Sequence, residues 1–128
     1  QPPPGFPGLE TALPLMLTAV HEGRLTLEDL VDRMSHNPRK IFQIEEQPDT
    51  WIEIDPEAAA EIRSDQLHTR CAWTPFDGWK VRGRVLKVVL RGREVFADGK
   101  VLAQPGSGKW LHAWRHTNKN QIKEKIHE

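Results

Sequence analysis

The sequence predicts a mixed α/β chain in which helices come first and β-strands follow. Between residues 9 and 42 the apolar residues recur at the spacing of amphipathic helices. From Trp51 onward, β-rich runs are separated by turns that contain glycine. This periodicity fades after residue 108. We therefore expect a helical part over residues 1–48, a β part over 49–108 and a polar tail or linker over 109–128.

The first helix is expected from Leu9 to about Glu22, with Thr11 as its N-cap and Pro14 in its first turn. Gly23 follows as a helix end. The apolar stripe of this helix consists of Leu9, Leu13, Leu17 and Val20.

A second helix is expected to begin at Thr26, because Asp29 three residues later nearly completes a capping box. Its buried stripe consists of Leu27, Leu30, Val31 and Met34. Asn37–Pro38 is expected to break this helix and to cap a short turn that ends at Phe42.

The first predicted strand is the alternating run Trp51–Ile54, which Asp55–Pro56 closes. Residues 57–78 are less regular; Ala58–Ala60 suits a helical turn. The clearer signals lie further on: a turn at Thr74–Gly78, β-rich runs at Trp79–Leu90 and Glu94–Leu102, a turn at Arg91–Arg93 and a hairpin marker at Asp98–Gly99.

Composition excludes some classes of function. Hydrophobic residues make up 38% and charged residues 28%, and the formal net charge is zero, which argues against a general nucleic-acid or membrane-surface binder. No apolar run is long enough to span a bilayer, and no signal-peptide pattern is present. A lone Cys71 fits a reducing compartment, so we expect the protein in the cytoplasm.

Two clusters invite a functional interpretation, and a simpler one is preferred for each. His112 and His116 have the i, i+4 spacing of metal ligands, but no further ligands complete a tetrahedral site. A solvated tail is the better account. The basic residues Lys80, Arg82 and Arg84 alternate with smaller residues, which is typical of a half-exposed strand rather than of a nucleic-acid site.

The opening segment, residues 1–10, combines four prolines with two glycines. Proline restricts the backbone, and glycine permits close approach, so the segment reads as a stiff loop held near a ligand and followed directly by a helix. Because the first residue is not Met, we expect the chain to begin inside such a loop of a larger protein.

Four motifs in this order carry a resemblance to a known family. They are Pro2–Thr11 leading into Leu13–Leu15, Ser35–Phe42, Trp51–Pro56, and Trp73–Gly78 followed by Gly83–Val85 and Val89–Gly92. With them, the chain resembles the C-terminal part of a dihydroorotase of the amidohydrolase superfamily, most closely the dihydroorotase region of the animal multifunctional pyrimidine-synthesis proteins. The resemblance covers about residues 1–108.

The resemblance implies an α/β fragment: the last helices of a (β/α)8 barrel followed by strands of a small C-terminal β domain. It implies a zinc-dependent hydrolase that reversibly cyclises N-carbamoyl-L-aspartate to L-dihydroorotate in pyrimidine biosynthesis. It also implies homo-oligomers, and fused carbamoyl-phosphate synthetase and aspartate carbamoyltransferase domains.

By the same resemblance, the zinc ligands and the catalytic Asp lie upstream of the position that matches Gln1. This chain would hold no catalytic residue and no metal ligand, and alone it is expected to be inactive. What it would contribute is substrate binding: the backbone groups of Pro4 and Gly5 would hold the dihydroorotate ring.

Alternatives remain open at this point. One is a hydantoinase-like cyclic amidase or a non-catalytic, metal-free scaffold of the same superfamily. Another is an interaction or nucleic-acid-binding module that uses the basic strands. If the helices are cut from a barrel, Leu13, Leu17, Leu30 and Val31 would lose the neighbours that cover them, so we expect an isolated chain to be loosely folded or oligomeric.

Overall fold

A computed structural model describes residues 5–111 of the chain. Its helical part comprises α1 (Ala12–His21), α2 (Leu27–Val31), the π-helical turn η1 (Asp32–His36) and α3 (Asn37–Ile41). Its sheet comprises β1 (Trp51–Glu61), β2 (Lys80–Leu90), β3 (Arg93–Ala97) and β4 (Lys100–Val101), with the short 3₁₀ turn η2 (Ser64–Gln66) between β1 and β2. Within residues 5–111, no helix has the length and apolar composition needed to cross a membrane.

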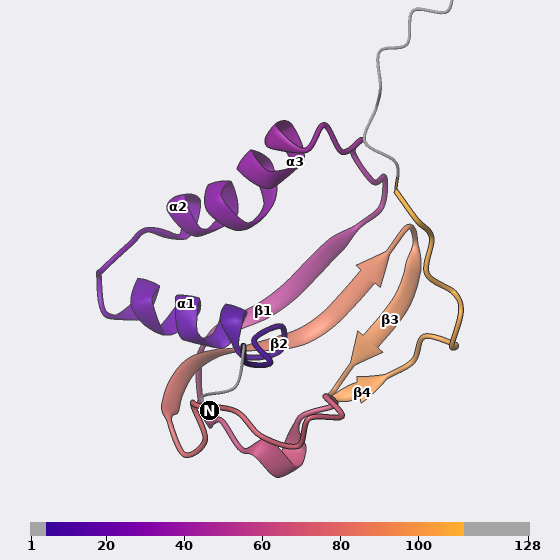
Figure 1. Cartoon of the computed structure of the whole chain (residues 1–128). Helices are drawn as coiled ribbons and strands as arrows, with labels where there is room; N and C mark the ends of the chain where they lie inside the picture. The colour runs from indigo at the N-terminus through magenta and orange to yellow at the C-terminus, as the bar shows by residue number, and fades with distance from the viewer. Residues whose placement is uncertain (1–4, 112–128) are drawn as a thin grey trace, which may run out of the picture.

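The helices lie together on one side of an antiparallel sheet whose four strands follow the order β1-β2-β3-β4 (Figure 1). In the described part of the chain, α1 is the helix that contacts the sheet, mainly β2. Helix α2 packs against α1, and neither α2 nor α3 reaches a strand. The core is therefore small and lies between α1 and the first two strands.

Helix α1 confirms the predicted helix but not the predicted stripe. Leu17 is 2% exposed, whereas Leu9 precedes the helix and is 99% exposed. Thr11 occupies the N-cap position without a side-chain cap. It is buried, and its hydroxyl donates backward to the Gly8 carbonyl at 3.3 Å. The helix ends at His21, and the expected Gly23 follows with a φ of 71°, which suits glycine.

Helix α2 begins with the predicted capping box: Thr26 Oγ1 accepts from the Asp29 amide at 3.1 Å, and the Thr26 amide donates to the Asp29 carboxylate at 3.2 Å. The predicted break at Asn37–Pro38 is wrong, since Asn37 is helical and its amide donates to the Asp32 carbonyl, five residues earlier. Proline lacks the donor of a regular helix and its ring crowds the preceding turn. The widened π turn accommodates it, and α3 continues.

The predicted buried stripe of the second helix is mostly exposed. Leu30 is 3% exposed, but Leu27, Val31 and Met34 each keep two fifths or more of their surface accessible. The periodicity correctly located an apolar face. Of the four residues in this predicted stripe, however, only Leu30 is buried.

Strand β1 is longer than predicted. Asp55 does form a tight turn, because its carboxylate accepts from the amides of Glu57 at 3.0 Å and Ala58 at 3.2 Å. This turn is a bulge, since the register with β2 shifts between Asp55 and Ala59 and pairing then resumes. The helical turn expected at Ala58–Ala60 is therefore wrong: these residues are strand because β2 supplies their hydrogen-bond partners.

The later strands and turns confirm the sequence expectations. Arg91 and Gly92, with φ of 51° and 73°, link β2 to β3, and Asp98 and Gly99, with φ of 48° and 77°, link β3 to β4. Positive φ at both central residues is the requirement of the tight hairpin turn that matches strand twist. Residues 75–78 form the predicted turn before β2.

Candidate functional site

The loop that the sequence singled out lies on the surface at the start of α1. Gly5 is exposed, and a Cβ built on it would meet no atom within 4 Å. The ring of Phe6 packs edge-on against Phe76 with centroids 5.6 Å apart, and Phe76 packs in the same way against Trp79 at 5.2 Å. This aromatic row joins the loop to the turn before β2. Pro4, the other predicted substrate contact, lies outside the described residues.

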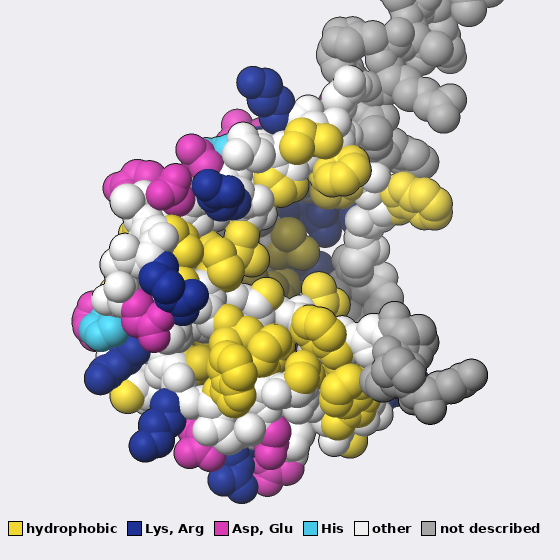
Figure 2. Space-filling view, turned by 60° about the vertical axis from the view of Figure 1, so that its left-hand side comes forward, with side chains coloured by type: hydrophobic (Ala, Val, Ile, Leu, Met, Phe, Trp, Pro, Cys, Tyr) yellow, Lys and Arg dark blue, Asp and Glu magenta, His cyan; other side chains and the backbone are white. Residues whose placement is uncertain are grey.

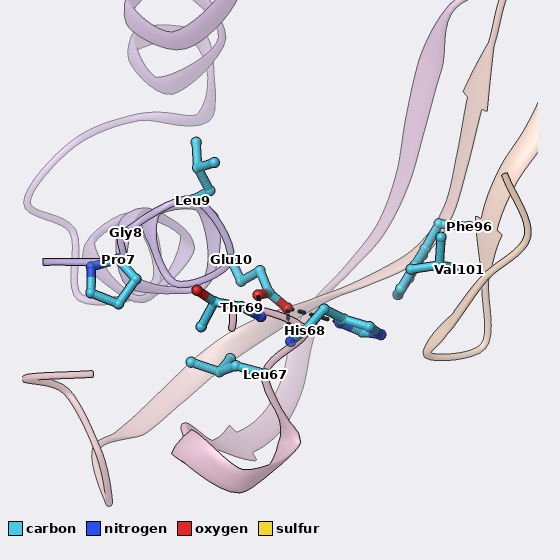
Figure 3. Close-up of a pocket in the computed structure, with 9 residues that line it drawn as sticks. All are labelled: Pro7, Gly8, Leu9, Glu10, Leu67, His68, Thr69, Phe96 and Val101. Carbon is cyan, nitrogen blue, oxygen red and sulfur yellow. Dashed lines mark hydrogen bonds and ion pairs between the residues drawn. The ribbon is translucent and has the colours of Figure 1, made fainter. Parts of the chain in front are cut away.

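Glu10 provides a second attachment for the loop. Its carboxylate accepts hydrogen bonds from the His68 amide, from His68 Nδ1 and from the Thr69 amide, each at 2.9 Å (Figure 3). The partners lie 58 and 59 residues further along the chain, in the connection between β1 and β2. Glu10 thus joins the end of the loop to a segment that is distant in the sequence.

The electrostatics of Glu10 favour its ionised form. Burial alone would raise its pKa, but the hydrogen bonds from His68 and Thr69 outweigh burial and hold the pKa below its usual value. A carboxylate that accepts several N–H groups is stabilised as the anion. Glu10 is therefore a charged acceptor in the folded protein.

The connection between β1 and β2 is itself closed at its base. The Asp77 carboxylate accepts from the Ser64 amide at 2.6 Å and from the Ser64 hydroxyl at 2.8 Å, and these two bonds lower the pKa of Asp77. Backbone bonds from Gly78 to Ile62 at 2.8 Å and from Ile62 to Trp79 at 2.9 Å complete the closure. Residues 62–79, which we call the clasp, are therefore closed at their base by hydrogen bonds, and the loop contacts them through Phe6 and Glu10.

A cleft of about 430 Å³ opens between the loop, the clasp and the β3–β4 hairpin (Figure 3). Its lining consists of Pro7, Gly8, Leu9, Glu10, Leu67, His68, Thr69, Phe96 and Val101. Most of these side chains are apolar, and the Glu10 carboxylate is already engaged by the clasp. The cleft offers surface for packing; it does not by itself assemble an acid, a base and a nucleophile.

The described residues do not fit a metal site, since no three His, Cys, Asp or Glu side chains among them gather closely enough to hold an ion. The His112–His116 pair lies outside the described residues. On β2, Lys80, Arg82 and Arg84 are exposed and alternate with less exposed residues. This confirms the half-exposed strand that the sequence pattern predicted. Arg82 also donates to the Glu57 carbonyl at 3.1 Å.

Sequence reasoning found the loop but missed what holds it. Glu10 belongs to the opening motif, yet nothing near it in the sequence indicates His68 or Thr69 as partners. The one signal in the sequence is that Glu10 is a charged residue directly before the predicted N-cap, Thr11; in the structure the Thr11 hydroxyl donates to the Gly8 carbonyl. Such a carboxylate is free to bond elsewhere.

Several known proteins are similar in sequence to this chain. No protein-family model matches the chain. The multifunctional protein pyr1-3 of Dictyostelium discoideum is 62% identical over 108 residues, covering 84% of this chain and 5% of that protein. The multifunctional protein CAD of Squalus acanthias is 56% identical over 113 residues, covering 88% and 5%. A dihydroorotase of Pyrococcus furiosus is 38% identical over 119 residues, covering 88% and 28%.

Solved structures of similar fold include a hydantoinase and a dihydroorotase-like domain. The L-hydantoinase (dihydropyrimidinase) of Arthrobacter aurescens matches with a TM-score of 0.81 and 34% identity, over 84% of this chain and 26% of that one. The inactive dihydroorotase-like domain of a CAD-like multifunctional protein from Chaetomium thermophilum matches with a TM-score of 0.66 and 34% identity, over 77% and 27%. The chain thus spans under a third of each of these relatives.

Proposed function

We propose that this chain is a C-terminal part of a dihydroorotase domain and that it serves the reversible cyclisation of N-carbamoyl-L-aspartate to L-dihydroorotate in pyrimidine biosynthesis. The observation that carries this proposal is the 62% identity over 108 residues to a multifunctional protein, together with 38% identity to a dihydroorotase. The whole protein would be a cyclic-amide hydrolase, and this chain would supply one wall of its substrate site.

We propose that residues 1–48 form the end of a barrel, that residues 49–108 form part of a β domain and that residues 109–128 form a tail or linker. Exposed apolar residues on the helical part support this division. Ile41 is 71% and Phe42 64% exposed, and hydrophobic side chains gather around a hollow on one face of the molecule (Figure 2). In a barrel, neighbouring elements would cover such a face.

Within this chain, Pro4 and Gly5 are the proposed contacts to the dihydroorotate ring. The support at Gly5 is steric: a Cβ built there would meet no atom within 4 Å, so a ligand has room to approach the backbone on that side. Phe6, the next residue, packs edge-on against Phe76 and so attaches the loop beside Gly5. The contact would fix the position of the ring and leave the chemistry to other residues.

We propose that the zinc implied by the family resemblance is bound by residues upstream of this chain; within residues 5–111, no three His, Cys, Asp or Glu side chains gather to hold an ion. We also propose fused carbamoyl-phosphate synthetase and aspartate carbamoyltransferase domains, since the relatives in Dictyostelium and Squalus are named multifunctional proteins. We further propose that the complete protein is a homo-oligomer and that it is located in the cytoplasm.

Activity assays test this function. The purified 128-residue chain, supplied with zinc and dihydroorotate, should show no turnover above background, whereas the complete protein should hydrolyse dihydroorotate. In the complete protein, Gly5→Ala should raise KM, because its methyl group enters the proposed ring space. Gly108→Ala is the matched control, since Gly108 is equally open. Equal KM values for Gly5→Ala and Gly108→Ala would contradict the ring contact.

The structural match to an L-hydantoinase favours a second candidate, a hydantoinase-like cyclic amidase. A competition assay separates the two activities. Faster turnover of a five-membered hydantoin than of dihydroorotate by the complete protein would favour the hydantoinase. The match to an inactive dihydroorotase-like domain raises a third outcome, a non-catalytic scaffold, for which neither substrate would turn over.

A further inference from the structure

We propose that Glu10 is a positioning residue for the substrate loop: by bonding to His68 and Thr69 it fixes the backbone at Gly5. This inference rests on the proposed function, because it requires the loop to bind the substrate ring. Glu10 itself need not touch the substrate. Its role would be to hold the loop in the conformation that binds.

The contacts of Glu10 make it a rigid link. One carboxylate oxygen accepts from the His68 amide and from His68 Nδ1, and the other accepts from the Thr69 amide. Two of the three donors are backbone groups, which cannot rotate away. Bonds to a charged acceptor are also stronger than neutral ones. The carboxylate therefore fixes Glu10 relative to the clasp in both position and orientation.

Hydrogen bonds next to Glu10 also hold the end of the loop in place. The Gly8 carbonyl accepts from the Ala12 amide at 2.9 Å and from the Thr11 hydroxyl at 3.3 Å, so the end of the loop is bound to α1. Thr11 is 2% exposed and has little freedom to shift. Glu10 lies between Gly8 and Thr11 in the sequence and connects this part of the chain to the clasp.

A second attachment constrains the other end of the loop. Phe6 adjoins Gly5 and packs on Phe76, which belongs to the same clasp. The Asp77 bonds to Ser64 close the clasp at its base. The loop is therefore held at Phe6 and at Glu10 by one platform, and release of either attachment should broaden the positions available to Gly5.

The decisive variant is Glu10→Gln in the complete protein. Glutamine has nearly the same shape, but it replaces one acceptor oxygen with an NH₂ group that faces N–H donors. Asp29→Asn is the matched control, because Asp29 is also a carboxylate that accepts from a backbone amide and a hydroxyl, at 3.2 Å and 3.1 Å, and it lies on α2 away from the loop. Glu10→Asp, which keeps the charge but shortens the side chain, serves as a second variant.

We expect Glu10→Gln to raise KM for dihydroorotate by about 10-fold with a smaller change in kcat, since misplacement of a binding group by a fraction of an ångström has effects of this order. Asp29→Asn should leave KM unchanged. Hydrogen exchange should show faster exchange at the His68 and Thr69 amides in Glu10→Gln only. A double variant with Gly5→Ala should raise KM by less than the product of the two single effects, because both act on one loop.

The outcomes separate the two proposals. If Gly5→Ala raises KM but neither Glu10→Gln nor Glu10→Asp does, the positioning role is wrong and the proposed function stands. Multiplying effects in the double variant, or an equal rise in KM for Asp29→Asn, would also overturn it. If Gly5→Ala leaves KM unchanged while the two amides still respond to Glu10→Gln, the ring contact fails, and the positioning role fails with it.

Discussion

Leu17 of α1 lies directly over Gly83 of β2, and no other residue could occupy position 83 without displacing the helix. A Cβ on Gly83 would lie 2.5 Å from Leu17 Cδ1 and 2.6 Å from Leu17 Cβ. The second atom is attached to the helix backbone, so a change of rotamer cannot relieve the clash. Gly83 also has a φ of 93°, which side chains rarely adopt. The missing side chain is what allows α1 to approach the sheet.

Gly83→Ala should therefore destabilise the fold by about 3 kcal/mol, from overpacking and backbone strain together. Gly99→Ala separates the two causes, since Gly99 has a φ of 77° but a Cβ added there would meet no atom within 4 Å. It should cost only about 1 kcal/mol. Thermal or urea unfolding of both variants in the same protein context measures the difference. Equal losses would mean that Leu17 does not restrict position 83.

Thr18→Val should lower the free energy of unfolding by about 1 kcal/mol. Thr18 Oγ1 accepts from the Arg82 amide at 2.8 Å and donates to the Pro14 carbonyl at 2.8 Å, so it joins α1 to β2 beside Gly83. Valine has the same shape but leaves the Arg82 amide without this acceptor. Thr18→Ser keeps the hydroxyl and should retain most of the stability. The comparison of the two variants by urea unfolding checks the claim, and a serine variant as weak as valine would contradict it.

Acid should weaken the attachments of the clasp. In Glu10, burial acts to raise the pKa, but hydrogen bonds lower it below the ordinary value of 4.5; in Asp77, bonds from Ser64 lower the pKa below 3.8. Because the folded state favours both carboxylates, their contribution is complete above these ordinary values and is lost as pH falls through the lowered ones. The stability difference between wild type and Glu10→Gln should shrink as pH falls through the lowered pKa of Glu10. A difference that does not change down to pH 2 would refute this linkage.

The 128-residue chain by itself should self-associate through its exposed apolar face. Ile41 and Phe42 are 71% and 64% exposed, and nothing within residues 5–111 covers them. Sedimentation at rising concentration should show oligomers, and the double change Ile41→Lys and Phe42→Lys should shift the chain toward monomer. A double change to alanine at exposed Lys40 and Gln43 is the control. A monomer with a sharp cooperative melt at all concentrations would contradict the prediction.

Elements whose causes are local could be predicted from the sequence. Thr26 and Asp29 lie three residues apart and complete their own capping box, and Asp98–Gly99 contains the residues that its turn requires. The failures have a common origin. Asp55–Pro56 did turn the chain, but pairing with β2 resumed beyond it, and Ala58–Ala60 became strand because partners were available. Pro38 was accommodated by a π turn.

The sequence by itself determined the order of helices and strands, the hairpin turns and the family resemblance, because each depends on residues close together in the chain. The tertiary structure alone decided how the loop is held. Glu10 meets His68 and Thr69 across 58 and 59 residues, and Leu17 meets Gly83, because β1 and β2 pair and α1 packs on the sheet. Contacts at such separation leave no periodic signal, since they depend on the folded path of the backbone rather than on spacing.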